Sequence, residues 1–284
     1  MSLAEVQRPI LVVQTPIISG EDLKKLLHVD HKILGHNFQL ALDHGRAMTS
    51  TRQQRATWLM QEPAFQQWFR AMGSHILIVD GMEQEMDTIS SLSYFCAMLH
   101  NNLSSLQVAI PLTFFCGLHA KPGENLEGAQ GIMRSLIYQL LLLHLDFDYS
   151  FRDYPFLEGI RNQSIVHLCR LFRNLLTSFQ SATVFCMIDG ISEYEISSRL
   201  YDVNIMMGYF KDLVDETNRE DSGINFKFLV TSSMACRLAR VWFPFGRHLV
   251  MPDDAGLDGP IEFNIASESR LLTDLEYIND FTPH

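Results

Sequence analysis

The sequence contains no Gly-Lys dipeptide, no CxxC pair and no histidine pair with HxH or HxxxH spacing. Without such cysteine and histidine pairs no ordinary metal motif is present, and we predict neither a metal nor a cofactor. The strongest apolar run, residues 136–145, has about half of the ~20 residues that cross a bilayer. We therefore expect no membrane span. The N-terminal segment has neither a basic start nor an apolar stretch long enough for a signal peptide, so we expect none.

The five cysteines form an odd set, and most stand inside apolar runs such as ATVFCMID. This usage is typical of reduced, buried thiols in a cytoplasmic protein. A length of 284 residues and a hydrophobic content of 47% are sufficient for one large domain or two small ones.

Charge is unevenly distributed along the chain, although the net charge of −11 argues against a broad nucleic-acid surface. Residues 1–72 carry eight Lys or Arg against six Asp or Glu, whereas the rest carries fourteen against twenty-seven. Any contact with a polyanion is therefore expected at the front of the chain. The candidate residues for this contact are Lys24, Lys25, Lys32, Arg46, Arg52 and Arg55. The alternative is that these side chains are simply solvated on the exposed faces of helices.

Periodicity changes near residue 73. Residues 21–72 have helical spacing of apolar residues, with Pro63 starting a new turn, and predict an N-terminal helical layer. After residue 73, β-rich runs at 75–80, 108–115, 182–189, 226–232 and 247–251 alternate with helix-like segments at 90–104, 130–145, 164–180, 200–218 and 234–243. The pattern predicts an α/β fold with a five-stranded parallel sheet covered by helices on both faces. The expected division is 1–72 and 73–284.

Several segments resemble fungal P-loop proteins of the STAND/NACHT type. WLMQEPAFQQWF (58–69) is similar to the segment before their first strand, and FFCGLH followed by GAQGIMRSLIYQLL is similar to their second strand and helix. VFCMIDGISEYE (184–195) resembles the Walker B strand, and FKFLVTSS (226–233) resembles the sensor strand. The resemblance implies a P-loop NTPase-like fold in which Asp189 occupies the magnesium-binding position. Capping of the next loop is the alternative role for Asp189.

The phosphate-binding loop departs from that pattern. A working loop reads GxxxxGK[ST], since glycine amides surround the phosphates and lysine neutralises them. Residues 81–88 instead read GMEQEMDT, which places Met86 at the second glycine, Asp87 at the lysine, and Glu83 and Glu85 beside them. One like-charge pair at ~4 Å is unfavourable by about 4 kcal/mol at an effective dielectric near 20. We therefore predict that the chain does not hydrolyse ATP.

Acidic residues follow two strands that the P-loop arrangement makes close neighbours, so a strongly negative cleft is expected between them. Such a cleft favours a guanidinium or an ammonium group, because carboxylates bind these in bidentate fashion. Its members are Asp80, Glu83, Glu85 and Asp87 from one loop and Asp189, Glu193 and Glu195 from the other.

In length and in its acidic cleft the chain also resembles the fungal arginine-containing cyclodipeptide synthases, which join amino acids taken from aminoacyl-tRNAs. That resemblance implies arginyl-tRNA as a partner, bound by the basic front of the chain. One or two of Asp189, Glu193 and Glu85 would hold the arginine, and another carboxylate or His119 would act as general base. Further candidates for contact with the substrate are Asp80, Glu83, Asp87, Glu195, Tyr194, Cys116 and Ser232.

Plainer interpretations stand beside these roles. Cys116 and Ser135 are possible acyl acceptors, but a packed thiol and a helix-face residue are the preferred interpretations, and packing is likewise preferred for Tyr194. The chain as a whole has two alternative functions: a non-catalytic pseudo-NTPase that serves as a scaffold with a protein partner, or an atypical nucleotide binder that uses Asp189 and Thr88 with magnesium.

Overall fold

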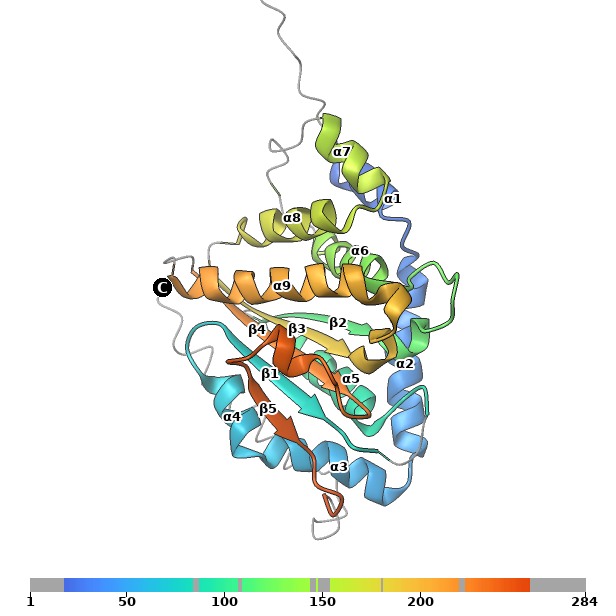
Figure 1. The fold of residues 1–284 in the computed structure, drawn as a ribbon, viewed down its shortest axis with the longest axis vertical. Coiled ribbons are helices and arrows are strands. Elements are labelled where there is room, and N and C mark those ends of the chain that lie inside the picture. The colour runs from blue at the N-terminus through green and yellow to red at the C-terminus, as the bar shows by residue number, and fades with distance from the viewer. Residues whose placement is uncertain are drawn as a thin grey trace, which may run out of the picture.

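Five parallel strands form the centre of the molecule, in the order β2-β3-β4-β1-β5 (Figure 1). The computed structural model describes residues 18–83, 87–106, 109–143, 147, 154–179, 181–219 and 223–255. The strands are β1 (His75–Asp80), β2 (Ala109–Phe115), β3 (Ala182–Asp189), β4 (Ile224–Ser232) and β5 (Arg247–Val250). All four pairings are parallel. The predicted fold class is confirmed.

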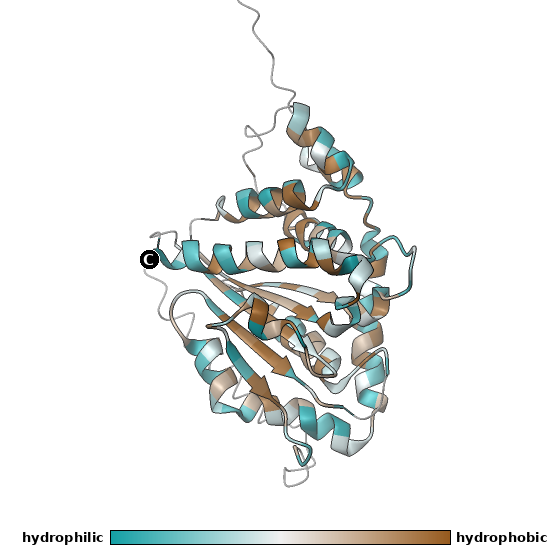
Figure 2. Ribbon diagram, viewed as in Figure 1, coloured by the Kyte–Doolittle hydropathy of each residue, from teal (hydrophilic) through white to brown (hydrophobic). Residues whose placement is uncertain are grey.

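Helices α6 (Gly128–Leu141), α8 (Ile165–Leu176) and α9 (Ser197–Arg219) cover one face of the sheet. α8 shows why the chain forms a helix there, since Ile165, Leu168, Phe172 and Leu175 recur at three- and four-residue spacing and all are buried. The apolar positions concentrate on the strands and on the inner sides of the helices, as Figure 2 shows.

The other face is covered by α3 (Ser50–Gln61), α4 (Pro63–Arg70) and α5 (Ser91–Leu103). Pro63 is at the first turn of α4, where its missing N–H is not needed, so the predicted new turn at this residue is confirmed. α1 (Gly20–Leu26) and α2 (His31–Ala47) complete the N-terminal helices. Leu23 of α1 packs into the core on the α6 side, whereas Ala41 of α2 packs into the core on the α5 side.

Two helices differ from the sequence prediction. α7 (Tyr154–Arg161) is an additional helix that falls in a stretch read as a connection. α10 (Ala239–Trp242) is a single turn, where the pattern predicted ten residues of helix. The 3-10 turns η1 (Cys116–His119) and η2 (Ile191–Tyr194) directly follow β2 and β3. Both turns lie at the edge of the sheet where the site was predicted.

All five cysteines are free and buried, as predicted. Burial raises the pKa of each thiol, and it raises that of Cys169 to about 12. We expect no thiol of the native protein to react with a neutral aromatic disulfide reagent within minutes, and five to react in denaturant. Absorbance of the released thiolate measures both numbers. A rapidly reacting native thiol would contradict the packing described here.

Candidate functional site

The candidate site lies at the carboxyl ends of the parallel strands, where ligands of open α/β sheets bind. Here the sequence prediction needs one correction. β1 and β3 are not adjacent, because β4 pairs with both and separates them. Ser93 of α5 and Thr231 of β4 contact Asp189 at this end of the sheet, on the side toward β1.

Arg52 of α3 holds the described part of the 81–88 turn. Its Nη1 donates a hydrogen bond to Asp87 Oδ2 at 2.6 Å, and its Nη2 donates to Glu83 Oε2 at 3.1 Å. Nη2 also donates to the Ile89 carbonyl at 3.2 Å. We call Arg52, Glu83 and Asp87 together the Arg52 clamp. The guanidinium that the acidic turn was predicted to attract is thus supplied by the chain itself.

The clamp is largely removed from water. Exposed side-chain fractions are 13% for Arg52, 4% for Glu83 and 45% for Asp87. Burial acts to lower the pKa of Arg52, but the two carboxylates outweigh burial and the pKa rises. The second oxygen of Glu83 accepts a hydrogen bond from the Ser91 amide at 2.8 Å, at the start of α5. Glu83 therefore links α3 to α5 and has no oxygen left without a partner.

Asp189 ends β3 and is buried between two hydroxyl groups. Ser93 Oγ donates to Oδ2 at 2.7 Å, and Thr231 Oγ1 donates to Oδ1 at 2.6 Å. Burial raises the pKa of Asp189 to about 6, although both hydroxyls act to lower it. Glu83, whose negative charge is nearby, raises it further. The carboxylate at the magnesium-binding position thus has hydroxyl partners on both oxygens.

Asp80 and Glu195 also accept hydrogen bonds from within the chain. Asp80 Oδ2 lies 2.8 Å from His248 Nε2, and its Oδ1 accepts from the Cys236 amide at 3.0 Å. Glu195 accepts from the amides of residues 237 and 238 at 3.0 and 2.7 Å. Both carboxylates thereby fix the segment between β4 and β5. They meet at Cys236, whose amide donates to Asp80 and whose thiol donates to Glu195 at 3.1 Å.

His119 is buried, and both of its ring nitrogens have partners. Nε2 lies 2.8 Å from Asn37 Nδ2, and Nδ1 lies 3.2 Å from Glu124 Oε1. Burial lowers the pKa of His119, while Glu124 acts to raise it. A general base needs a free nitrogen within reach of a substrate proton, and this geometry offers none.

The other residues proposed to contact a substrate are mostly buried. Burial raises the pKa of Cys116 well above its usual value, and the negative charges of Asp189 and Glu193 add to this effect. The Tyr194 hydroxyl donates to the His119 carbonyl at 3.1 Å. Ser232 is buried at the end of β4, where its hydroxyl has no partner among the described residues.

Three further candidates have simple placements. Glu193 is exposed at the surface of η2. Ser135 is fully buried in α6 and accepts a hydrogen bond from Gln139 at 3.2 Å. Glu85 lies outside the described residues.

Five of the six basic residues at the front of the chain have partners within the chain. Lys24 pairs with Glu21 at 2.8 Å, Lys25 with Asp22 at 3.0 Å and Arg46 with Asp43 at 3.2 Å. Arg52 forms the clamp, and Arg55 is buried, donating to the carbonyls of residues 81, 252 and 253. Lys32 is exposed. Their predicted role in binding RNA stays a prediction.

Sequence reasoning missed the partners that occupy the carboxylates. Thr231 and Ser232 end the same strand, and because alternate residues of a strand face opposite sides, only one of them can face Asp189. The sequence shows this alternation, but it does not show whether Thr231 or Ser232 is the residue that faces Asp189. The Ser-rich start of α5 predicts a helix cap, which Ser90 and Ser93 form. The contact between Ser93 and Asp189 has no sequence signal, since 96 residues separate them.

A cavity of about 310 Å³ remains beside the Arg52 clamp, lined by side chains that include Thr49, Arg52, Arg55 and Glu83. Met82, also in its wall, has a φ of 53°, a left-handed conformation that disfavours side chains larger than glycine. Within the described ranges no three His, Cys, Asp or Glu side chains are grouped as metal ligands. The arrangement is suited to holding α3, α5 and the strand ends together.

None of the helices in the described part of the chain has the length and apolarity to cross a membrane.

Comparison with known proteins gives one family. A search of curated proteins found no match. The family model described as Nephrocystin 3, N-terminal, matches residues 54–233, which include α4, β1 to β4 and both 3-10 turns. This match covers well over half of the chain, and the protein therefore belongs to the nephrocystin 3 N-terminal family.

Proposed function

We propose that this chain is a non-catalytic pseudo-NTPase module that serves as a scaffold or regulatory unit for a protein partner. The observation that carries the proposal is the Arg52 clamp. In a working phosphate loop a lysine and a row of glycine amides face the phosphates. Here the lysine position is Asp87, and the neighbouring cation, Arg52, is neutralised by Asp87 and Glu83.

The environment of Asp189 supports the same proposal. Magnesium prefers near-ideal octahedral geometry and usually retains several waters, so a magnesium-binding carboxylate needs an open side. Both oxygens of Asp189 instead accept hydroxyl hydrogen bonds in a buried place. Binding of magnesium would require Ser93 and Thr231 to give up these bonds.

The proposal predicts that ATP with magnesium does not stabilise the protein. A ligand at 100 times its Kd stabilises the native state by about 2.7 kcal/mol, which corresponds to a rise in Tm of roughly 5–10 °C for a domain of this size. We expect a change below about 1 °C at 1 mM ATP with 5 mM magnesium, measured by differential scanning calorimetry. Magnesium alone serves as the control. A clear rise that requires both components would favour the atypical nucleotide binder and contradict the proposal.

Aminoacyl transfer from arginyl-tRNA is the alternative from the sequence, and three observations weigh against it. The guanidinium site on the acidic turn is filled by Arg52, His119 has both nitrogens engaged, and Asp189 is buried. The decisive measurement is expression of the full chain in a bacterial host, followed by mass spectrometry of the medium for arginine-containing cyclic dipeptides. Product that disappears with Asp189→Ala would establish the enzyme and refute the scaffold.

A further inference from the structure

A second cavity lies at the opposite edge of the sheet, where the strands begin. Its volume is about 500 Å³, larger than the cavity beside the Arg52 clamp. Its walls come from α4, the start of β1, α9 and the segment that leads into β5. Cavities of roughly 300–1,000 Å³ are typical of sites for small organic molecules. None of the residues discussed for the phosphate loop contributes to this cavity.

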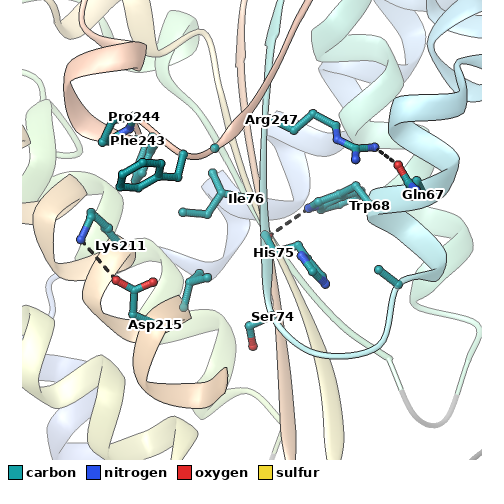
Figure 3. Close-up of a pocket in the computed structure, with 14 residues that line it drawn as sticks. Gln67, Trp68, Ser74, His75, Ile76, Lys211, Asp215, Phe243, Pro244 and Arg247 are labelled. Atoms are coloured by element: carbon teal, nitrogen blue, oxygen red, sulfur yellow. Dashed lines mark hydrogen bonds and ion pairs between the residues drawn. The ribbon is translucent and has the colours of Figure 1, made fainter. Parts of the chain in front are cut away.

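Rigid apolar groups form much of the wall. Trp68 is fixed by a hydrogen bond from its Nε1 to the His75 carbonyl at 3.1 Å (Figure 3). Phe243 packs edge to face on Phe228, with 5.7 Å between the ring centroids. Ile76 lies between them in the same view. The walls are therefore preformed, so little side-chain ordering opposes binding of a flat apolar group.

Phe245 at the rim is 96% exposed. Removing apolar surface from water is favourable, so an exposed ring beside a preformed cavity favours a ligand that covers it. An apolar body that fills the cavity would extend over this ring.

The charged groups of the wall give the cavity a positive balance in a chain of net charge −11. Lys211 is paired with Asp215 at 3.2 Å and also lies 4.0 Å from the Asp212 carboxylate. Arg247 donates only to uncharged acceptors, Gln67 Oε1 and the Ala64 carbonyl. In the described ranges Arg247 forms no ion pair with a carboxylate, which leaves one cation at the rim without a counter-charge.

The pKa of His75, in the wall of the cavity, is also affected by nearby positive charges. Burial lowers the pKa of His75, and the charges of Lys227 and Arg247 lower it further. Lys227 lies buried behind the wall, where its side-chain nitrogen donates to the Ala71 carbonyl. Burial lowers the pKa of Lys227 to about 7, so it carries only part of a positive charge at pH 7. The groups around the cavity thus disfavour an added positive charge and favour a negative one.

We propose that this cavity binds a small organic anion with a flat apolar body, of the aryl carboxylate class. The carboxylate pairs with the Arg247 guanidinium, and the apolar body occupies the space among Trp68, Ile76 and Phe243. A planar guanidinium binds a carboxylate through two parallel hydrogen bonds, which favours this anion over a halide or a neutral amide. The inference goes beyond the scaffold function, since neither the Arg52 clamp nor Asp189 takes part.

The test uses the full chain and three probes of nearly equal shape: naphthalene-2-carboxylate, naphthalene-2-carboxamide and 2-naphthylmethylammonium. Isothermal titration calorimetry at pH 7 and low salt measures each Kd. We expect the acid to bind with a Kd between about 10 µM and 1 mM, the amide about tenfold more weakly and the ammonium not detectably. Equal binding of the three probes, or no binding of the acid at 5 mM, would overturn the proposal.

Three variants locate the site. Arg247→Gln is expected to weaken binding of the acid about tenfold, because a hydrogen bond between two charged groups is stronger than one from a neutral amide. Arg237→Gln, whose side chain is exposed at the opposite edge, is the matched control and is expected to change nothing. Asp215→Asn removes the shorter of the two carboxylate contacts of Lys211, leaving Asp212 at 4.0 Å, and is expected to tighten binding about threefold. Near-UV circular dichroism shows that each variant is folded, and unchanged binding by Arg247→Gln would refute the site.

Discussion

The Arg52→Gln variant is expected to lose about 3 kcal/mol of folding free energy. Removal of one partner from a buried ion pair typically destabilises by 3–5 kcal/mol, since the remaining charge stays buried without compensation. Glu83, with 4% of its side chain exposed, is left in that position, whereas Asp87 is 45% exposed and can be hydrated. Urea unfolding monitored by circular dichroism at pH 7 measures the difference in free energy.

Two further variants separate charge from packing. The double variant Arg52→Gln with Glu83→Gln is expected to recover about 2 kcal/mol, because no buried charge remains unpaired. Arg46→Gln removes an exposed ion pair with Asp43 and is the matched control, with an expected change below about 0.5 kcal/mol. An Arg52→Gln variant as stable as the wild type would show that the clamp contributes nothing to the fold.

Asp189→Asn is expected to stabilise the protein by about 2 kcal/mol at pH 8 and to have little effect at pH 4. The pKa of Asp189 is raised from 3.8 to about 6, and each pKa unit corresponds to about 1.4 kcal/mol. The folded state therefore binds this proton more tightly than the unfolded state. Below pH 3.8 both states are protonated, and as the pH rises through 6 the ionised carboxylate destabilises the folded state by about 3 kcal/mol.

The amide side chain keeps the shape and part of the hydrogen bonding to Ser93 and Thr231, which is why the expected gain is smaller than the full 3 kcal/mol. Urea unfolding of both proteins at several pH values between 4 and 8 gives the difference. The exposed Asp254→Asn serves as the control. A variant that is less stable than the wild type at pH 8 would show that the two hydroxyl bonds outweigh burial of the charge.

The fold was predictable because its strands are short apolar runs with sharp limits. The runs at 75–80 and 182–189 coincide with β1 and β3, and that at 226–232 begins two residues after the observed start of β4. Such runs are buried on both sides, so burial alone determines their extent. The length of α10 was not predictable, since the amides of residues 236, 237 and 238 donate to the side chains of Asp80 and Glu195, and a sequence pattern does not show these partners.

The site was less predictable, because composition shows which charges are present but not which of them pair. The acidic turn and the basic helix were both visible in the sequence, and each was assigned an external ligand. In the structure Arg52 and Asp87, 35 residues apart, are partners of one another. A single sequence contains no record of that pairing. Periodicity places side chains on faces, whereas contacts between faces depend on how the helices pack against the sheet.

The position of Arg52 also affects how the phosphate loop can change. Replacement of Asp87 by lysine alone, the first step toward a working loop, would place an ammonium where a carboxylate now lies 2.6 Å from the guanidinium. Two like charges at ~4 Å repel by about 4 kcal/mol at an effective dielectric near 20, comparable to much of the stability of a domain. On the proposed function, the clamp therefore opposes a change of Asp87 to lysine unless Arg52 changes as well.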